Sequence, residues 1–470
     1  MAAAPVKPLV AIVGATGTGK SDLAVEIARK YNGEVINGDA MQLYEGLPII
    51  TNKITKDEMK GVPHHLLGCI GLDEETWTVG KFVSKALGVI NEIRSRGKLP
   101  VLVGGTHYYT QSLLFQDALS EELQLENEKG QQTGRFPILD EPTAVILEKL
   151  KEVDTVMADR WHPNERRKIQ RSLEIYLKTG KPASQIYDEQ RLKREVSLAA
   201  PECETSDVGL RFPTLLLWVH ASKDLLYTRL DGRIDKMIQK GLLSEVQRLS
   251  DFAASYEKRT GAPVDLTRGI WVSIGYKEFL DYHAALSNPS LSESDLAKMR
   301  TAAIEKTQAA TRQYAKRQIR WIQIKLLNAS LAAGQRSNIF LLDGSDLSKW
   351  EGDVIRPAIQ VTEQFLSGKP LPNPTQLSGA AQEMLTPKRD FDLAQRPDLW
   401  QKKVCDTCGT VAVTENDWYL HIKSRAHRRA VGNKKKQEHS ESSATKKGKG
   451  TAEDSIDLFE SSLNNFSEKV

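Results

Sequence analysis

The residue pattern with the clearest chemistry lies near the N-terminus, in the segment GATGTGKS at positions 14–21. It satisfies the pattern G-x-x-x-x-G-K-[ST], whose glycines let backbone N–H groups turn inward around phosphate oxygens. The lysine adds a positive charge, and the next hydroxyl can hold Mg²⁺. The pattern predicts a phosphate loop for a diphosphate or triphosphate, formed by Gly14, Ala15, Thr16, Gly17, Thr18, Gly19, Lys20 and Ser21. It leaves open whether the phosphate is transferred or departs.

An acidic residue is expected beside such a loop. An ATPase would have an apolar strand that ends in an Asp able to hold Mg²⁺. The strand expected at 99–105 runs instead into Gly-Gly-Thr-His, whereas another early strand leads to Asp39 in Gly-Asp-Ala-Met-Gln. Asp39 could be a metal ligand, a general base or the N-cap of a helix. The residues alone leave these three interpretations open.

A group of cysteines and histidines near the C-terminus has the spacing of a zinc site. The group consists of Cys405, Cys408, His421 and His427. Two residues lie between the two cysteines, twelve between Cys408 and His421, and five between the two histidines. This is the spacing of a tetrahedral Cys₂His₂ site, and because all ligands come from the protein the Zn²⁺ would be structural. The histidine spacing resembles matrin-type fingers, which favour RNA or protein partners. Nearby basic residues point to RNA phosphates, although the run 434–436 could instead be a nuclear address.

The elements around the phosphate loop alternate between strands and helices. Amphipathic or capped helical segments are expected after the loop, around 80–95 and from about 107. Strands with apolar residues on both faces are expected at 8–13, 34–38, 99–105 and 214–220. This alternation predicts an α/β fold with a parallel sheet.

Composition and charge limit the class of protein. The chain has 470 residues with 40% hydrophobic and 27% charged residues, which is ordinary for a soluble globular protein. No apolar stretch reaches the length of a membrane span, so no membrane association is expected. Its four cysteines do not suggest a disulfide scaffold, which favours a reducing intracellular compartment. Residues 401–450 carry twelve Lys and Arg against five Asp and Glu, which suggests a polyanionic partner.

Six motifs follow one another along the chain. They are GDAMQLYEGLPIITNKIT (38–55), GVPHHLLG (61–68), PVLVGGTHYY (100–109), HPNERRKIQRSLEIYLKTGKPAS (162–184), SIGYKEF (273–279) and TRQYAKRQIRW (311–321). In this order they resemble one family, the tRNA dimethylallyltransferases, which prenylate the adenosine just 3′ of the anticodon. The appended finger is similar to that of its eukaryotic-type members.

The resemblance implies a reaction and its catalytic residues. A dimethylallyl group would pass from dimethylallyl diphosphate to the exocyclic N6 amine of that adenosine, and the diphosphate held by the phosphate loop would depart. Mg²⁺ on Ser21 would assist, and the catalytic residues would be Asp39 as general base, Thr106 and Lys20. Two departures are expected to alter the site: Ala40 stands where the family commonly has Ser, and His107 with Tyr108 replaces small residues after Thr106.

The resemblance also implies a tRNA partner that binds through its anticodon stem-loop. On a helix, Arg312, Lys316 and Arg320 would share one face, which is suited to a phosphate backbone. Gln42 could read the edge of a base that has left its stack. The expected tRNA-binding residues are Asp39, Ala40, Met41, Gln42, Arg166, Arg167, Lys168, Ile169, Gln170, Arg171, Gly275, Tyr276, Lys277, Arg312, Lys316, Arg317 and Arg320.

The expected architecture is a P-loop NTPase-like parallel sheet with a helical tRNA-binding insertion and a small C-terminal zinc finger. The segments are the P-loop α/β core at 1–118, the helical insertion at 119–210, the continued core with basic helices at 211–335, a connecting region or linker at 336–400, the finger at 401–432 and a disordered tail at 433–470.

Two other functions fit parts of the sequence. A P-loop kinase acting on a nucleotide or an RNA end would transfer phosphate from ATP, and an RNA-binding scaffold would keep the loop only as a relic. The expected protein is a monomer in the cytoplasm, with the mitochondrion and the nucleus also open.

Overall fold

The computed structural model describes the residues 4–115, 136–189, 192, 209–386 and 399–447, and of 437–447 only the backbone. The chain divides into two compact units. Unit one comprises Met1–Gly134 and Asp188–Gln395, and unit two comprises Arg135–Tyr187 and Arg396–Val470.

Unit one is built on a parallel sheet of six strands in the order β3-β2-β4-β1-β5-β6. Nearly every residue of these strands is buried, as expected for a sheet covered on both faces. The expected α/β fold with a parallel sheet is confirmed. The strands are β1 (Leu9–Gly14), β2 (Gly33–Asn37), β3 (His64–His65), β4 (Leu99–Val103), β5 (Thr214–His220) and β6 (Ile339–Asp343).

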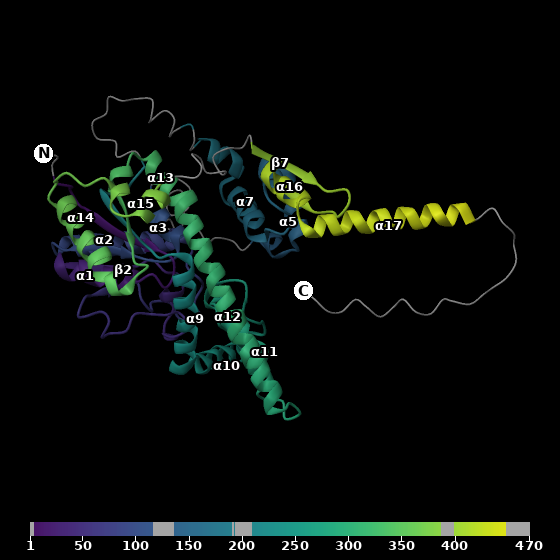
Figure 1. Ribbon diagram of the computed structural model, residues 1–470, viewed down its shortest axis with the longest axis horizontal. Helices are drawn as coiled ribbons and strands as arrows, with labels where there is room; N and C mark the ends of the chain where they lie inside the picture. Colours follow the sequence, from purple (N-terminus) through teal and green to yellow (C-terminus); the bar gives the residue numbers. More distant parts are fainter. Residues whose placement is uncertain (1–3, 116–135, 190–191, 193–208, 387–398, 448–470) are drawn as a thin grey trace. The chain divides into compact units, whose positions relative to one another are not determined.

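Alternate residues of every strand except the short edge strand β3 pack into two separate hydrophobic cores. On β1, Val10 and Ile12 face the core formed by α1 (Lys20–Lys30) and α14 (Arg356–Leu366). Leu9, Ala11 and Val13 face the opposite core, which includes residues of α2 (Val79–Ser95), α3 (His107–Leu114) and α15 (Gly379–Met384). Figure 1 shows these helices around the sheet.

A group of longer helices completes unit one. The long helix α12 (Glu293–Trp321) packs against α9 and α11, and continues through a π-helical turn, Ile322–Leu326, into α13 (Figure 1). Among the described residues, no helix combines the length and apolar character that crossing a membrane requires. The other helices of this group are α9 (Lys223–Lys240), α10 (Leu242–Thr260), α11 (Tyr276–Ala285) and α13 (Leu327–Ala332).

The segment expected as a connecting region at 336–400 is largely part of the fold, which corrects that prediction. Its apolar run 339–342 forms β6, the edge strand of the sheet, beside β5. A π-helical turn (Glu351–Ile355) and α14 then cover one face of the sheet. The prolines in this segment suggested a linker. The segment nevertheless contains the strand β6, which packs into both cores of the sheet, and the amphipathic helix α14, which packs into one of them.

Unit two joins helices of the expected insertion with the C-terminal segment. It contains α5 (Thr143–Val153), α6 (Thr155–Arg160) and α7 (Arg166–Thr179), followed by a hairpin of β7 (Trp400–Val404) and β8 (Val411–Thr414), then α16 (Glu415–Ile422) and α17 (Arg425–Lys447). Trp400 packs edge-on against Trp161, and the Arg160 guanidinium lies 4.9 Å from the centre of each ring. The hairpin therefore docks on the helices of unit two.

The tail expected to be disordered from residue 433 is also corrected, because α17 extends to Lys447. Its Lys, Gln, Glu and Ala residues are good helix formers. Residues 448–470 lie outside the described residues, as do 119–135, 190–191 and 193–208 of the expected insertion and 387–398 of the expected connecting region. Short 3₁₀ turns are Met41–Leu43, Pro137–Asp140, Gly269–Val272, Arg336–Asn338, Leu347–Lys349 and Pro374–Gln376.

Candidate active site

The phosphate loop joins β1 to α1, and its backbone conformation and close packing require glycine at several positions. Gly17 and Gly19 have φ angles of +81° and +88°, in the left-handed region that glycine adopts without a Cβ clash. A Cβ on Gly14 would lie 2.3 Å from the carbonyl oxygen of Val219 on β5. The loop thus starts at the carboxyl end of a central strand, where parallel sheets bind ligands.

Lys20 begins α1, and its ammonium group lies within the loop. Its Nζ donates a hydrogen bond to the carbonyl oxygen of Ala15 at 2.6 Å. Burial lowers the pKa of Lys20 to about 8, the Asp39 carboxylate opposes this shift, and Arg233 adds to it. An anion bound in the loop would supply the charge that favours the protonated amine.

Asp39 follows β2 and is electrostatically coupled to Lys20. Its Oδ1 accepts a hydrogen bond from the N–H of Met41 at 3.0 Å, and its own N–H donates to Oδ1 of Asn37 at 3.0 Å. Burial raises the pKa of Asp39, while the bond from Met41 and nearby positive charges oppose the rise. Its Oδ2 faces Gly105, where a Cβ would come within 3.0 Å. A held carboxylate with a raised pKa is suited to accepting a proton.

Thr106 connects the segments that follow β2 and β4. Its Oγ1 accepts a hydrogen bond from the N–H of Ala40 at 2.9 Å, and its hydroxyl also bonds with the side chain of Tyr314 on α12. Burial raises the pKa of Tyr314, so this phenol stays protonated. The structure thus places the Thr106 hydroxyl against the peptide N–H of Ala40, the residue after Asp39, where it positions that segment.

Gln318 on α12 joins two loops that are distant in sequence. Its Oε1 accepts from the N–H of Thr16 at 2.8 Å, and its Nε2 donates to the carbonyl oxygen of Gly105 at 2.8 Å. The side chain is 4% exposed. Gln318 is not among the site residues predicted from the sequence, although it lies inside the TRQYAKRQIRW motif. The bridge fixes the phosphate loop relative to the segment beside Asp39.

Arg233 on α9 is the main site residue that sequence reasoning missed. Its Nη2 donates to the hydroxyl of Thr16 in the loop at 2.9 Å, while its Nε is buried without a hydrogen-bond partner in the structure. Burial lowers its pKa, and Asp39 opposes that shift. One turn earlier, Leu230 packs under the loop, where a Cβ on Gly17 would meet its Cδ2 at 2.7 Å. A desolvated guanidinium beside a phosphate loop is suited to binding an anion.

His107, the departure expected to alter this part of the site, is a buried neutral imidazole. It is 4% exposed, and neither ring nitrogen has a hydrogen-bond partner in the structure. Burial lowers its pKa to about 3, with a contribution from the charge of Lys20. Its neighbour Tyr108 is 53% exposed and packs edge-on against Trp321.

The residues after Asp39 lie in a short 3₁₀ turn. The Sδ of Met41 accepts a hydrogen bond from the Ser273 hydroxyl at 3.3 Å. The Gln42 amide donates to the carbonyl oxygen of Asn52 at 3.0 Å, so its Nε2 is held by its own loop. Reading of a base edge by Gln42 stays a prediction.

The structure corrects one expected tRNA contact on α11 and gives one on α12 an acidic partner. Tyr276 is 2% exposed and packs edge-on against Trp271, so its side chain belongs to the core. Arg312 forms an ion pair with Asp231 at 2.5 Å, and its contact with tRNA stays a prediction. The remaining expected residues are Gly275, the buried N-cap of α11, and the exposed Lys277, Lys316, Arg317 and Arg320.

The basic helix α7 belongs to unit two. Some of its expected tRNA-binding residues are buried or hydrogen-bonded within the unit, and others are exposed. Ile169 is fully buried, which corrects its assignment as an RNA contact. Arg166 donates to the carbonyl oxygens of Leu139 and Glu141, and Gln170 also donates to Leu139. Those two side chains hold the turn before α5. Three exposed cations of the expected set remain on α7: Arg167, Lys168, which pairs with Glu165, and Arg171, which pairs with Glu174.

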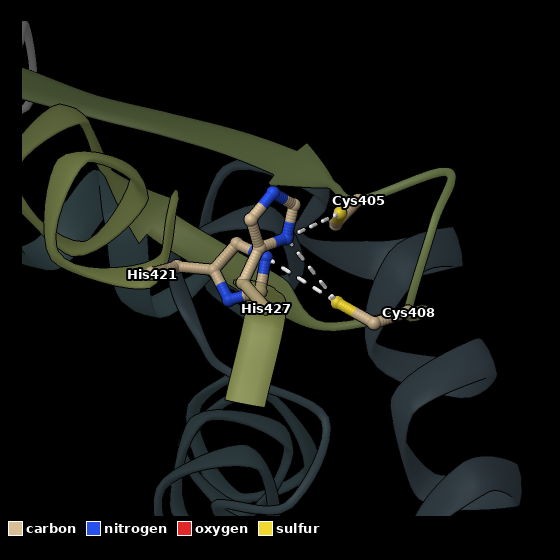
Figure 2. Close-up of side chains that lie close together, drawn as sticks. All are labelled: Cys405, Cys408, His421 and His427. Carbon is tan, nitrogen blue, oxygen red and sulfur yellow. Dashed lines mark hydrogen bonds between the residues drawn. The ribbon is translucent and has the colours of Figure 1, made fainter. Parts of the chain in front are cut away.

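The predicted cysteine and histidine ligands come together in unit two. Figure 2 shows the four side chains pointing toward one another, and their ligand atoms all lie within 4.8 Å. The Sγ of Cys405 lies 3.6 Å from Nδ1 of His427, and the Sγ of Cys408 lies 3.4 Å from Nε2 of His421. Tetrahedral Zn–S and Zn–N bonds would separate such atoms by about 3.5 Å. The donor set and its spacing fit a zinc ion.

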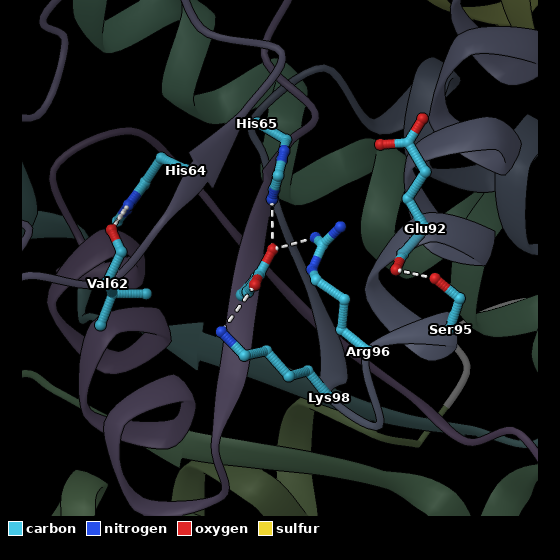
Figure 3. Close-up of polar contacts among 8 residues, drawn as sticks. Val62, His64, His65, Glu92, Ser95, Arg96 and Lys98 are labelled. Atoms are coloured by element: carbon cyan, nitrogen blue, oxygen red, sulfur yellow. Dashed lines mark hydrogen bonds and ion pairs between the residues drawn. The ribbon is translucent and has the colours of Figure 1, made fainter.

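A buried carboxylate also stabilises β2, the strand that precedes Asp39. The side chain of Glu34 on β2 is 3% exposed. Its carboxylate pairs with His65 of β3 and with Arg96, both at 2.6 Å, and with Lys98 at 2.9 Å (Figure 3). Burial alone would raise its pKa, but the bonds from Arg96, Lys98 and His65 lower it to about 2. Asn37, at the end of the same strand, bonds to both Asp39 and Leu66.

Comparison with known proteins identifies the family. The family described as IPP transferase matches residues 42–325. A "tRNA dimethylallyltransferase" of Schizosaccharomyces pombe is 38% identical over 91% of this chain and 96% of its own, and one of Homo sapiens is 34% identical over 89% and 85%. A crystal structure described as a eukaryotic dimethylallyltransferase acting on tRNA has a TM-score of 0.74 at 32% identity, covering 93% of this chain and 99% of that one. The chain therefore belongs to the IPP transferase family.

Proposed function

We propose that the chain transfers a dimethylallyl group from dimethylallyl diphosphate to tRNA, at the N6 amine of the adenosine 3′-adjacent to the anticodon. The observation that carries this proposal is the placement of a cationic phosphate loop next to a carboxylate with a raised pKa. The loop suits a diphosphate leaving group, and the carboxylate suits removal of a proton from the attacking amine.

On the donor side, the phosphate loop receives the charge that develops as the allylic C–O bond breaks. The ammonium of Lys20, the guanidinium of Arg233 and the loop amides stabilise this charge in a site shielded from water. The pKa of Lys20, near 8 without a ligand, rises when the diphosphate binds beside it.

Ser21, at the end of this loop, is of the residue type that holds Mg²⁺. The Ser21 hydroxyl is at the start of α1, and Mg²⁺ needs few protein ligands because it keeps waters and takes phosphate oxygens. Ser21 would hold the ion, which would neutralise part of the diphosphate charge.

On the acceptor side, the adenine amine attacks the allylic carbon and becomes positively charged as the C–N bond forms. Asp39 accepts one proton from it, so the prenylated amine is neutral and the diphosphate carries away the electrons of the broken C–O bond. Thr106 and Asn37 hold the backbone on which Asp39 sits. The target base has to leave its stack to reach this carboxylate.

The tRNA backbone would be held by exposed cations. On α12 these are Lys316, Arg317 and Arg320, and each phosphate contact would add to the salt dependence of binding. In unit two, a structural Zn²⁺ held by the four Cys and His ligands would order the finger, whose exposed basic residues would add contacts to RNA phosphates. Function as a monomer, and location in the cytoplasm, mitochondrion or nucleus, stay predictions.

The test is incubation of the purified protein with radiolabelled dimethylallyl diphosphate, Mg²⁺ and unmodified tRNA, followed by nucleoside analysis. The proposal expects label on the N6 of one adenosine next to the anticodon. No label, together with phosphate transfer from ATP, would support a kinase instead. RNA binding with neither reaction would support an RNA-binding scaffold.

A further inference from the structure

Trp350 lies directly against the phosphate loop and has no part in the chemistry described above. A Cβ added to Gly19 would meet Cη2 of this indole at 2.4 Å and its Cζ2 and Cζ3 at 3.0 Å. A Cβ on Gly344 would meet Cζ3 at 2.7 Å. Gly19 also needs its positive φ, but no such φ occurs at Gly344. The indole therefore sits in a socket that two glycines keep open.

The segment that carries Trp350 is fixed to the rest of the sheet edge. After β6, the N–H of Gly344 donates to the carbonyl oxygen of His220 at 2.8 Å. The Ser345 hydroxyl accepts from the N–H of Ser222 at 2.8 Å and donates to Oδ1 of Asp343 at 2.5 Å. These bonds tie the loop after β6 to the loop after β5, and Trp350 itself packs against the core around α14.

The strand order puts this indole and the catalytic carboxylate on opposite sides of the phosphate loop. In the order β2-β4-β1-β5-β6, the segments bearing Asp39 and Thr106 follow β2 and β4, on one side of β1. Trp350 follows β6, on the other side. Because the strands are parallel, all these segments leave the same edge of the sheet. A phosphate ester bound in the loop can thus extend its organic group either toward Asp39 or toward Trp350.

We propose that Trp350 is a specificity-determining residue that excludes nucleotides from the phosphate loop by filling the space a nucleoside would need. An indole and a purine are both bicyclic aromatic systems of similar size, so the ring closes that side to nucleoside diphosphates and triphosphates. The small dimethylallyl group needs only the side toward Asp39. This inference rests on the proposed function, since it assumes that the loop binds a diphosphate.

The experiment measures binding of two probes, ADP and inorganic diphosphate, by calorimetry with Mg²⁺ present. Trp350→Ala removes the ring, and Trp350→Leu removes it while keeping an apolar side chain against the core around α14. Phe365→Ala is the matched control, because Phe365 belongs to the same core and is 8% exposed. Thermal melting checks that each variant is folded.

Both Trp350 variants are expected to bind ADP about tenfold to a hundredfold more tightly than the wild type, as burial of a base in a new cavity would allow. Their affinity for inorganic diphosphate should stay within about twofold, and Phe365→Ala should change neither affinity. An unchanged ADP affinity in folded Trp350→Ala and Trp350→Leu would overturn the inference. Equal gains for both probes would also overturn it, because they would indicate a loosened loop. A wild type that binds no inorganic diphosphate would instead refute the proposed function.

Discussion

Arg233 offers the sharpest test of the site, because only the fold brings it to the phosphate loop. Arg233→Ala removes the guanidinium that donates a hydrogen bond to the Thr16 hydroxyl and interacts electrostatically with the Asp39 carboxylate. A preorganised donor to a developing negative charge contributes about 3–4 kcal/mol, so kcat/KM should fall by about 10²- to 10³-fold. Arg233→Lys keeps the charge but not the forked geometry and should recover only part of this loss.

The pH profile separates this role from general damage to the fold. The positive charge of Arg233 opposes the raised pKa of Asp39, so its removal should raise that pKa further. The base must be deprotonated, and the acid limb of kcat/KM should therefore move to higher pH in Arg233→Ala and not in Arg233→Lys. The assay is initial-rate measurement with labelled dimethylallyl diphosphate across pH. A loss of less than about tenfold with an unmoved acid limb would refute the reasoning.

Four further predictions follow from the site and its supports. Asp39→Asn should abolish turnover while tRNA affinity, measured by filter binding, stays within a few-fold; a near-normal rate would exclude Asp39 as the base. In the wild type, kcat/KM should fall above about pH 8 as free Lys20 loses its proton, and Lys20→Arg should move this limb upward; a limb that stays in place would assign it to another group. Cys408→Ser, or zinc chelation, should weaken tRNA binding without changing affinity for inorganic diphosphate, and an unchanged tRNA affinity would remove the finger from RNA binding. Glu34→Gln should reduce the free energy of unfolding near pH 7 by about 2–4 kcal/mol, as expected when a buried ion pair loses one charge. Folding lowers the pKa of Glu34 from 4.5 to about 2, so its contribution to stability is fully present above pH 4.5 and is lost as the pH falls toward about 2. Denaturant melts in which the variant keeps the acid dependence of the wild type would contradict this.

The local parts of the site could be predicted from the sequence. The phosphate loop has a fixed pattern of glycines between a buried strand and a helix, and Asp39 and Thr106 each follow an apolar strand. Parallel strands bring their carboxyl ends to one edge, so these residues had to meet. The spacing of the cysteines and histidines determined their convergence in the same way.

The parts that depend on packing between distant segments could not be predicted. Arg233 reaches Thr16 across 217 residues, and Gln318 reaches the same residue across 302. Nothing local distinguishes either side chain from a solvated one on an amphipathic helix. Conversely, Tyr276 and Ile169 lie in motifs that pointed to RNA, but the helices turn both into the core. The edge strand β6 was missed because the prolines that follow it suggested a linker.

The central claim is that the loop holds a departing diphosphate while Asp39 takes the proton of the attacking amine. The most direct measurement is a rapid-quench single turnover with excess enzyme, in which released diphosphate and prenylated adenosine are counted in the same samples. We expect both products to appear in equal amounts at one rate, and Asp39→Asn to form neither although it binds both substrates. Release of diphosphate without prenylated adenosine, or an unimpaired rate in Asp39→Asn, would contradict it.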